Sequence, residues 1–290
     1  MRSLAARGPR AAAKVGQRRG VADWDAVWSS PEPPAFHLPA ASQNLEERIG
    51  WLTEGCFDKK ALGRALVPLC GASLDVPYLA SLGLHTVGIE FSGPACDEAS
   101  RLWALQRTPA EVSSTVAVHG SLREPAAPSC ESLREDGARG SVALLRGDLF
   151  AVPPAALEPF GVVWDRGGVT SLSADTIRAS LRAIPAGELA DLPPVDPAAA
   201  AEGASAAVVG RAYFSRLAAL SVPGARLLIE TLAVEGGEPA GMEADTILAA
   251  LGGSGWERAE LFSRRDVTGL YPDMQVQGKL VEVLVGAVRA

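Results

Sequence analysis

The sequence predicts a doubly wound α/β fold, in which helices cover both faces of a mostly parallel sheet. Short apolar segments of strand length recur along the chain with helical segments between them, as such a fold requires. The first four strand candidates each end at a turn or polar group, at Gly71, Glu90, Asp148 and Asp165. Because ligands of open α/β sheets bind beyond the carboxyl ends of the strands, this pattern predicts a ligand site at that edge.

The first two strands lie in the stretch from residue 64 to residue 90. Residues 65–69 are apolar without alternation, which is typical of a parallel strand buried on both faces. Gly71 permits a tight turn, and Ser73 or Asp75 is expected to cap the following helix. Residues 86–89 form the next strand. Strand, turn, helix and strand together have the layout of a nucleotide-type cofactor site.

A carboxylate and a shortage of glycine indicate which cofactor binds. Glu90 follows Gly71 by about 20 residues, where α/β cofactor folds place an acid on ribose hydroxyls. A pyrophosphate needs several exposed backbone amides, which glycines make accessible, yet residues 69–72 contain one glycine. That turn suits a cofactor with ribose and adenine but no phosphates, which points to S-adenosylmethionine. The alternative is an ordinary α/β turn with a solvated Glu90.

Further segments complete the α/β pattern. We expect a helix over residues 94–106 and then a polar, proline-containing stretch over residues 107–140 without strands. Residues 185–209 are rich in Ala and Pro and are expected to form an inserted loop or a helix extension. The remaining strands are expected at residues 141–146, 162–164, 226–232 and 279–288.

Charge argues against one class of partner and sets the first 20 residues apart. The chain carries a net charge of −7, so no nucleic-acid partner is expected. Residues 1–20 hold six basic side chains and no acid, and they lack the apolar core of a secretory signal. We expect either a mitochondrial or plastid transit peptide, or a basic, disordered tail on a cytoplasmic protein.

Composition and cysteine spacing limit the classes of protein to which the chain can belong. The 290-residue chain is 48% hydrophobic, enough for one sizeable core. Its longest apolar runs have strand length, so no membrane insertion is expected. The four cysteines have neither CxxC spacing nor histidine neighbours, so no metal site and no disulfide framework are indicated: Cys56, Cys70, Cys96 and Cys130.

At two places the chain resembles a known family. The stretch VPLCGASLDVPYLASLGLHTVGIE, followed by GDLF and VWDRGG, resembles the thiopurine S-methyltransferase family, which also includes halide and thiol methyltransferases. Upstream, Trp24, Trp28, Phe36 and His37 resemble its Trp-x3-Trp and Phe-His segment. The resemblance implies a Rossmann-like class I methyltransferase: a seven-stranded sheet with an N-terminal helical cover, in a single domain over residues 21–290.

The resemblance also implies the residues that bind the cofactor. Leu69 and Gly71 would contact the methionine part through their backbone, and Glu90 would bind the ribose. Asp148 would lie at the adenine, and Arg166 at the far side of the cofactor or at the acceptor.

Aromatic side chains are implied to enclose the cofactor and the acceptor. These are Trp24, Trp28 and Phe36. The faces of their rings would attract the sulfonium by about 0.5–2 kcal/mol each when stacked closely. The alternative from spacing alone is that Trp24 and Trp28, at positions i and i+4, form the core-facing stripe of a helix.

Three residues are candidates for the chemistry itself. His37 is a candidate proton acceptor for a thiol because imidazole titrates near neutrality, and the alternative is a structural histidine. Asp165 and Arg166 follow the fourth strand, where a site role competes with an exposed ion pair of little energetic value. Arg166 also suits an anionic acceptor.

Two segments depart from the family pattern. Residues 29–34 replace a glycine that usually follows the second tryptophan, and residues 236–241 stand where a Gly-Pro-Pro-Phe segment helps to form the acceptor pocket. The expected function is methyl transfer to a small soft nucleophile, such as a thiol, a thiopurine, thiocyanate or a halide, by a monomer. The alternative is a catalytically inactive S-adenosylmethionine-binding regulatory protein.

Overall fold

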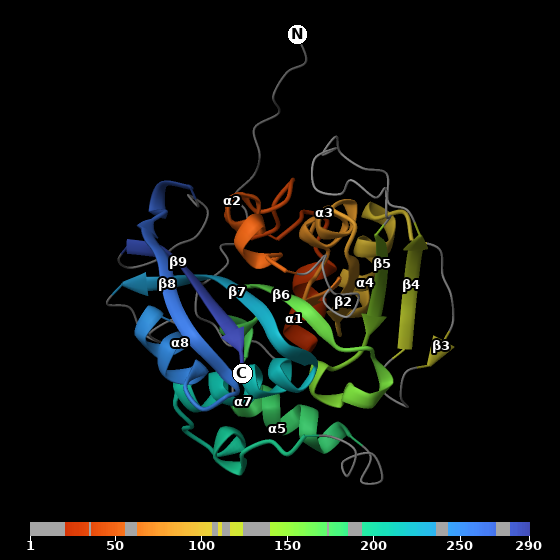
Figure 1. Ribbon diagram of the computed structural model, residues 1–290. Coiled ribbons are helices and arrows are strands. Elements are labelled where there is room, and N and C mark those ends of the chain that lie inside the picture. The colour runs from red at the N-terminus through yellow and green to blue at the C-terminus, as the bar shows by residue number, and fades with distance from the viewer. Residues whose placement is uncertain are drawn as a thin grey trace.

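The computed structural model describes residues 21–34, 36–55, 63–105, 110–111, 117–123, 140–172, 174–184, 193–235, 243–270 and 279–290. In these ranges one sheet runs through the molecule with helices on both of its faces (Figure 1). None of the described helices is both long enough and apolar enough to cross a membrane.

Five parallel strands form the centre of the sheet, in the order β5, β2, β1, β6 and β7. Their bounds are Ser141–Arg146, His85–Glu90, Arg64–Pro68, Phe160–Arg166 and Ser221–Glu235. Strand β9 (Lys279–Arg289) runs antiparallel to β7, and β8 (Trp256–Asp266) runs antiparallel to β9. These seven strands confirm the predicted doubly wound, mostly parallel sheet.

Two more strands extend the sheet beyond β5, so its described part has nine strands. Strand β4 (Ala117–Arg123) runs antiparallel to β5, and β3 (Ala110–Glu111) pairs with β4. The expectation that residues 107–140 lack strands is therefore wrong. Continuous apolar runs mark buried parallel strands, whereas β4 and the largely exposed β8 carry polar side chains and give no such run.

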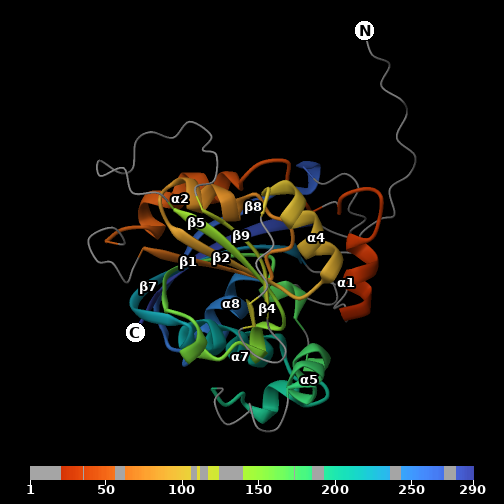
Figure 2. The same cartoon turned by 90° about the vertical axis from the view of Figure 1, so that its right-hand side faces the viewer.

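Helices cover each face of the sheet (Figure 2), and buried side chains form a separate layer on each face. The helices of the first layer are α2 (Gln43–Leu52), α3 (Asp75–Ser81) and α4 (Gly93–Leu102), and those of the second are α5 (Ala174–Ala183), α7 (Ala206–Ala219) and α8 (Ala244–Leu251). On β1, Ala65 and Val67 pack toward the first layer, whereas Leu66 packs toward the second. Both faces of β1 are therefore apolar, which explains why its sequence shows no alternation of apolar and polar residues.

The described part of the predicted insert packs into the second layer. Residues 185–192 lie outside the described residues. Pro197–Ala200 forms a short 3-10 helix, and α7 begins at Ala206. Ala199 and Val209 are completely buried in the core cluster that also contains residues of α5 and α8.

An aromatic contact holds the C-terminal end of α2 against the sheet. The rings of Trp51 and Phe262 meet edge to face, with centroids 4.9 Å apart. Gly286 of β9 lies beneath both rings, and a Cβ atom there would be 2.5 Å from Cε2 of Phe262. The guanidinium of Arg226 lies 4.9 Å from the Trp51 ring and donates to the Trp51 carbonyl. This contact fixes the helix whose other end begins beside the candidate site.

Candidate functional site

The turn after β1 has an unusual backbone. Leu69 and Gly71 both have positive φ angles, 48° and 52°. A positive φ is uncommon outside glycine and costs about 1–3 kcal/mol, so Leu69 is held there by its surroundings. The Cys70 amide donates to the Ile89 carbonyl (3.1 Å), which ties this turn to the end of β2. Such strain concentrates at binding sites, where it directs backbone groups toward a ligand.

Glu90 joins the end of β2 to the same turn. One carboxylate oxygen accepts from the Gly71 amide (2.9 Å), and the other accepts from the amides of Phe91 (2.9 Å) and Ser92 (2.7 Å). Burial raises the pKa of Glu90, and the three amides oppose that rise. A carboxylate offers about four acceptor positions, and these bonds within the described residues use three of them.

Trp28 lies directly over Gly71. A Cβ atom built on Gly71 would be 2.5 Å from Cζ2 of the Trp28 ring, closer than any real contact of that kind. The glycine is therefore needed twice, for the positive φ angle and for the approach of the indole.

The predicted aromatic residues come together above this turn. Phe36 meets Trp24 and Trp28 edge to face, with centroid distances of 5.8 and 6.0 Å, and His37 meets Trp28 at 5.9 Å. Phe36 also packs against a small core cluster that contains Val234 and Leu280. We call residues 21–34 and 36–37 the N-terminal cover.

Helix α1 (Val21–Trp28) forms the first part of the cover. Both of its tryptophans are partly buried and contact Phe36, so this helical stripe faces the candidate site. The Ser92 hydroxyl, directly before α4, donates to the Asp25 carboxylate (2.7 Å). That bond holds α1 beside the end of β2.

Arg166 lies where β6 meets the cover. Its Nε donates to Oδ2 of Asp75 (3.2 Å), and its Nη1 donates to the Phe36 carbonyl (3.1 Å). The side chain is 15% exposed, so most of it is enclosed by protein. The structure thus brings Arg166 into contact with the backbone of Phe36 in the aromatic cluster.

His37 is partly buried next to these groups. Burial is the main cause that lowers the pKa of His37, followed by the charge of Arg166, whereas Glu98 and Asp75 raise it. The imidazole is therefore neutral at pH 7 and has a free nitrogen that can accept a proton.

Asp165 points away from this cluster. Its carboxylate is completely buried and accepts from the amides of Gly168 (2.7 Å) and Val169 (3.3 Å). Burial raises the pKa of Asp165 to about 7, and the amides oppose the rise. Neighbouring residues of a strand face opposite sides, so Asp165 and Arg166 cannot both face the cover. The side chain of Asp165 stabilises the turn after β6.

Asp148 follows β5 and lies close to Glu90 through its backbone. The amide of the preceding Gly147 donates to the Glu90 carbonyl (2.9 Å). The Asp148 carboxylate accepts from the Phe150 amide (2.8 Å) and is hydrogen-bonded to Ser180 of α5. Burial raises the pKa of Asp148, and Ser180 opposes this rise most strongly. Asp148 thus lies at the predicted strand end, with its carboxylate turned toward α5.

The sequence analysis missed two buried acids beside the site. Asp75 accepts from the Arg166 side chain, and Glu230 of β7 accepts from the Ser42 hydroxyl and from Asn44 (2.9 Å). We expected Asp75 or Ser73 to cap α3, but the N-cap is Leu74 and no side chain bonds there. The sequence around Glu230 could have identified it, because it is a single acid within an apolar strand. Burying such a charge costs free energy unless the charge is paired or hydrogen-bonded.

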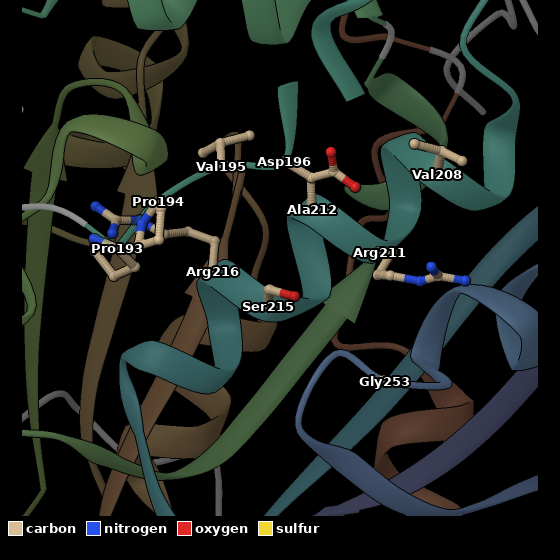
Figure 3. Close-up of a pocket in the computed structure, with 10 residues that line it drawn as sticks. All are labelled: Pro193, Pro194, Val195, Asp196, Val208, Arg211, Ala212, Ser215, Arg216 and Gly253. Atoms are coloured by element: carbon tan, nitrogen blue, oxygen red, sulfur yellow. The ribbon is translucent and has the colours of Figure 1, made fainter. Parts of the chain in front are cut away.

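A separate cavity lies on the other face of the sheet, beside α7 (Figure 3). It measures about 250 Å³ and is bounded by residues 193–196, one side of α7 and Gly253. Arg216 at its wall donates to the carbonyls of Leu149, Phe150 and Val152. Because these residues are not those of the Gly71 turn, the cavity is distinct from the candidate site.

The chain matches known proteins over its N-terminal part. Residues 20–182 match the family model described as thiopurine S-methyltransferase. The thiopurine S-methyltransferase of Xanthobacter autotrophicus is 28% identical over 152 residues, 52% of this chain and 60% of that protein. That of Pseudomonas paraeruginosa is 30% identical over 152 residues, 52% of this chain and 58% of that protein. The chain therefore spans about 60% of the length of these curated relatives.

One solved structure has a similar fold over nearly the whole chain. It comes from work on the conversion of a disulfide bond into a thioacetal group during echinomycin biosynthesis. The TM-score is 0.50 at 15% identity, and the match covers 93% of this chain and 92% of that chain. At this identity the likeness concerns the fold alone.

Proposed function

The chain belongs to the thiopurine S-methyltransferase family, and from this premise we propose that it transfers the methyl group of S-adenosylmethionine to a small thiol. The observation that carries the proposal is the aromatic cover packed over the strained turn at Leu69 and Gly71, with Glu90 bonded to that turn. Together they would give a carboxylate for the ribose and aromatic rings for the sulfonium.

The residues present fit S-adenosylmethionine. Glu90 would bind the ribose through its remaining acceptor position, and the backbone of Leu69 and Gly71 would hold the methionine part. Trp24, Trp28 and Phe36 would enclose the sulfonium. When bound, the cofactor supplies an electrophilic methyl group.

Asp148 and Arg166 have different proposed parts. Asp148 would border the adenine by its backbone, since its carboxylate is already bonded to Phe150 and Ser180. Arg166 keeps N–H groups beyond the two bonds to Asp75 and Phe36 and would face the acceptor. Asp165 would act only as a positioning residue for the turn that follows Arg166.

Methyl transfer requires that the acceptor is aligned with the methyl group and that water is excluded, and it does not require an enzyme nucleophile. The acceptor lone pair must approach the methyl carbon in line, at about 3–3.5 Å. A thiolate and a sulfonium neutralise each other as the new bond forms, so exclusion of water favours reaction over the hydrated ground state. The packing of Trp28 and Phe36 would provide that exclusion.

The state of His37 favours a protonated thiol over a halide as acceptor. A thiol must lose a proton before it attacks, and a neutral imidazole can take it. A halide carries no proton, so the same imidazole would contribute nothing. We therefore propose His37, which lies beside Trp28, as the proton acceptor.

Two measurements test the proposal. Calorimetric titration with S-adenosylmethionine should give binding, and a methyl-transfer assay over thiols, thiopurines, thiocyanate and halides should give the highest rates with thiols. Binding without turnover on every acceptor would exclude the enzyme and favour the regulatory protein. Absence of binding would exclude both.

A further inference from the structure

A single buried carboxylate gathers donors from three parts of the chain. Asp75 is 1% exposed. Its Oδ1 accepts from the Ser42 amide (2.7 Å), and its Oδ2 accepts from Ser73 Oγ (2.8 Å), Trp164 Nε1 (2.8 Å) and Arg166 Nε (3.2 Å). Three donors thus converge on Oδ2, and one donor binds Oδ1.

Arg166 is the charged partner in this set, and it has two fixed contacts. Nε is held by Asp75, and Nη1 is held by the carbonyl of Phe36 in the cover. A guanidinium is planar, so fixing Nε and Nη1 fixes the direction of its remaining N–H groups. Asp75 therefore determines where Arg166 points, and Trp164 and Ser73 in turn hold Asp75 in place.

Glu230 provides a comparison within the same cluster. It is also a buried acid, 5% exposed, and it also contacts Ser42, but through the hydroxyl rather than the amide. Within the described residues its carboxylate accepts from Ser42 and Asn44, and neither bond involves Arg166. Both acids anchor the start of α2. Burial raises the pKa of Glu230 and the charge of Arg166 opposes that rise, but of the two acids only Asp75 accepts a hydrogen bond from the arginine.

We propose that Asp75 is the positioning residue of the site, which orients Arg166 toward the acceptor and fixes the segment that follows the cover. The proposal rests on the proposed function, since it assigns Arg166 to the acceptor. In Asp75→Asn one side of the group would present an amide hydrogen to donors, so part of the set could not bond and Arg166 would lose its direction.

A double-mutant cycle tests the link to Arg166. Asp75→Asn in the wild-type background should lower kcat for a thiol by about a hundredfold, the scale of a 1 Å misplacement. The same substitution in an Arg166→Gln background should lower it little further, because Asp75 acts through the arginine. Equal losses in both backgrounds would overturn the proposal.

Glu230→Gln is the matched control. It removes the charge of a buried acid that contacts Ser42 but leaves Arg166 bonded to Asp75, so the loss of kcat should be much smaller than in Asp75→Asn. Asp75→Ala removes both oxygens, so hydrogen exchange of the Ser42 amide should accelerate in this variant and not in Glu230→Gln. An unchanged Ser42 amide in Asp75→Ala would also overturn the proposal.

Two outcomes require a further variant or measurement: a variant that does not fold, and a wild type without turnover. If Asp75→Asn does not fold, Ser73→Ala removes one donor to the same oxygen and should give a smaller loss of kcat, again absent with Arg166→Gln. If the wild type has no turnover, the proposed function fails. The Ser42 exchange measurement needs no substrate and still decides whether Asp75 holds this segment.

Discussion

The indole of Trp28 occupies the space where a side chain on Gly71 would stand, 2.5 Å from the position of a Cβ atom. The turn after β1 and the N-terminal cover are therefore built to fit one another. Gly71 cannot gain a side chain unless Trp28 moves.

Gly71→Ala should weaken binding of S-adenosylmethionine and displace Trp28. The added methyl group collides with the indole, and alanine at positive φ costs about 1–2 kcal/mol. Calorimetry would measure the affinity and tryptophan fluorescence the displacement. Gly50→Ala in α2 is the control, because nothing lies within 4 Å of its Cβ position. Equal affinity in both variants would contradict the fit described here.

Glu90→Ala should weaken cofactor binding about tenfold to a hundredfold. The loss corresponds to charge-assisted hydrogen bonds of about 1.5–3 kcal/mol. Calorimetric titration measures it, and Glu46→Ala, at an exposed acid of α2, controls for net charge. Because Glu90 also bonds the Gly71 amide, a melting curve must accompany the titration. Unchanged affinity would mean that Glu90 serves only the turn.

His37→Gln should lower the rate with an aliphatic thiol by about a hundredfold or more, the usual contribution of a general base. The rate with iodide, which has no proton to lose, should not change. In the wild type the thiol rate should fall as pH drops through a pKa below the usual histidine value of about 6.5, since protonation removes the acceptor nitrogen. Parallel losses for both acceptors would argue for a structural histidine.

The contribution of Asp165 to the free energy of unfolding should fall as pH rises from about 4 to about 7. Its folded-state pKa, about 7, lies above the ordinary value, so the folded protein keeps a proton that the unfolded chain releases in this window. Asp165→Asn should flatten this slope. Urea unfolding at several pH values checks it, and an equally steep slope in the variant would assign the effect to other buried acids.

Gly286→Ala should destabilise the fold by about 1–3 kcal/mol, because the new methyl group overlaps the rings of Phe262 and Trp51. Gly50→Ala should instead stabilise it by about 0.5–1 kcal/mol, since alanine favours the helix and meets no neighbour. Denaturant titrations of both variants would check these signs.

The sequence alone determined the parallel centre of the sheet. Apolar runs, turn residues and strand-end acids are local signals, and the predicted strand at residues 141–146 coincides with β5. The structure packs Trp28 against Gly71 and both tryptophans against Phe36, and their role around the cofactor stays a prediction of the family resemblance. Residues 1–20 and 236–241, which bear on targeting and on the acceptor pocket, lie outside the described residues.

Only the tertiary structure decided how the polar groups pair. Trp164 and Arg166 are 89 and 91 positions from Asp75, and Ser42 is 188 positions from Glu230, so no local pattern announces these bonds. Strand alternation turned Asp165 away from Arg166. Hydrogen bonding between distant segments depends on how the layers pack, because packing sets which buried donors and acceptors can satisfy one another.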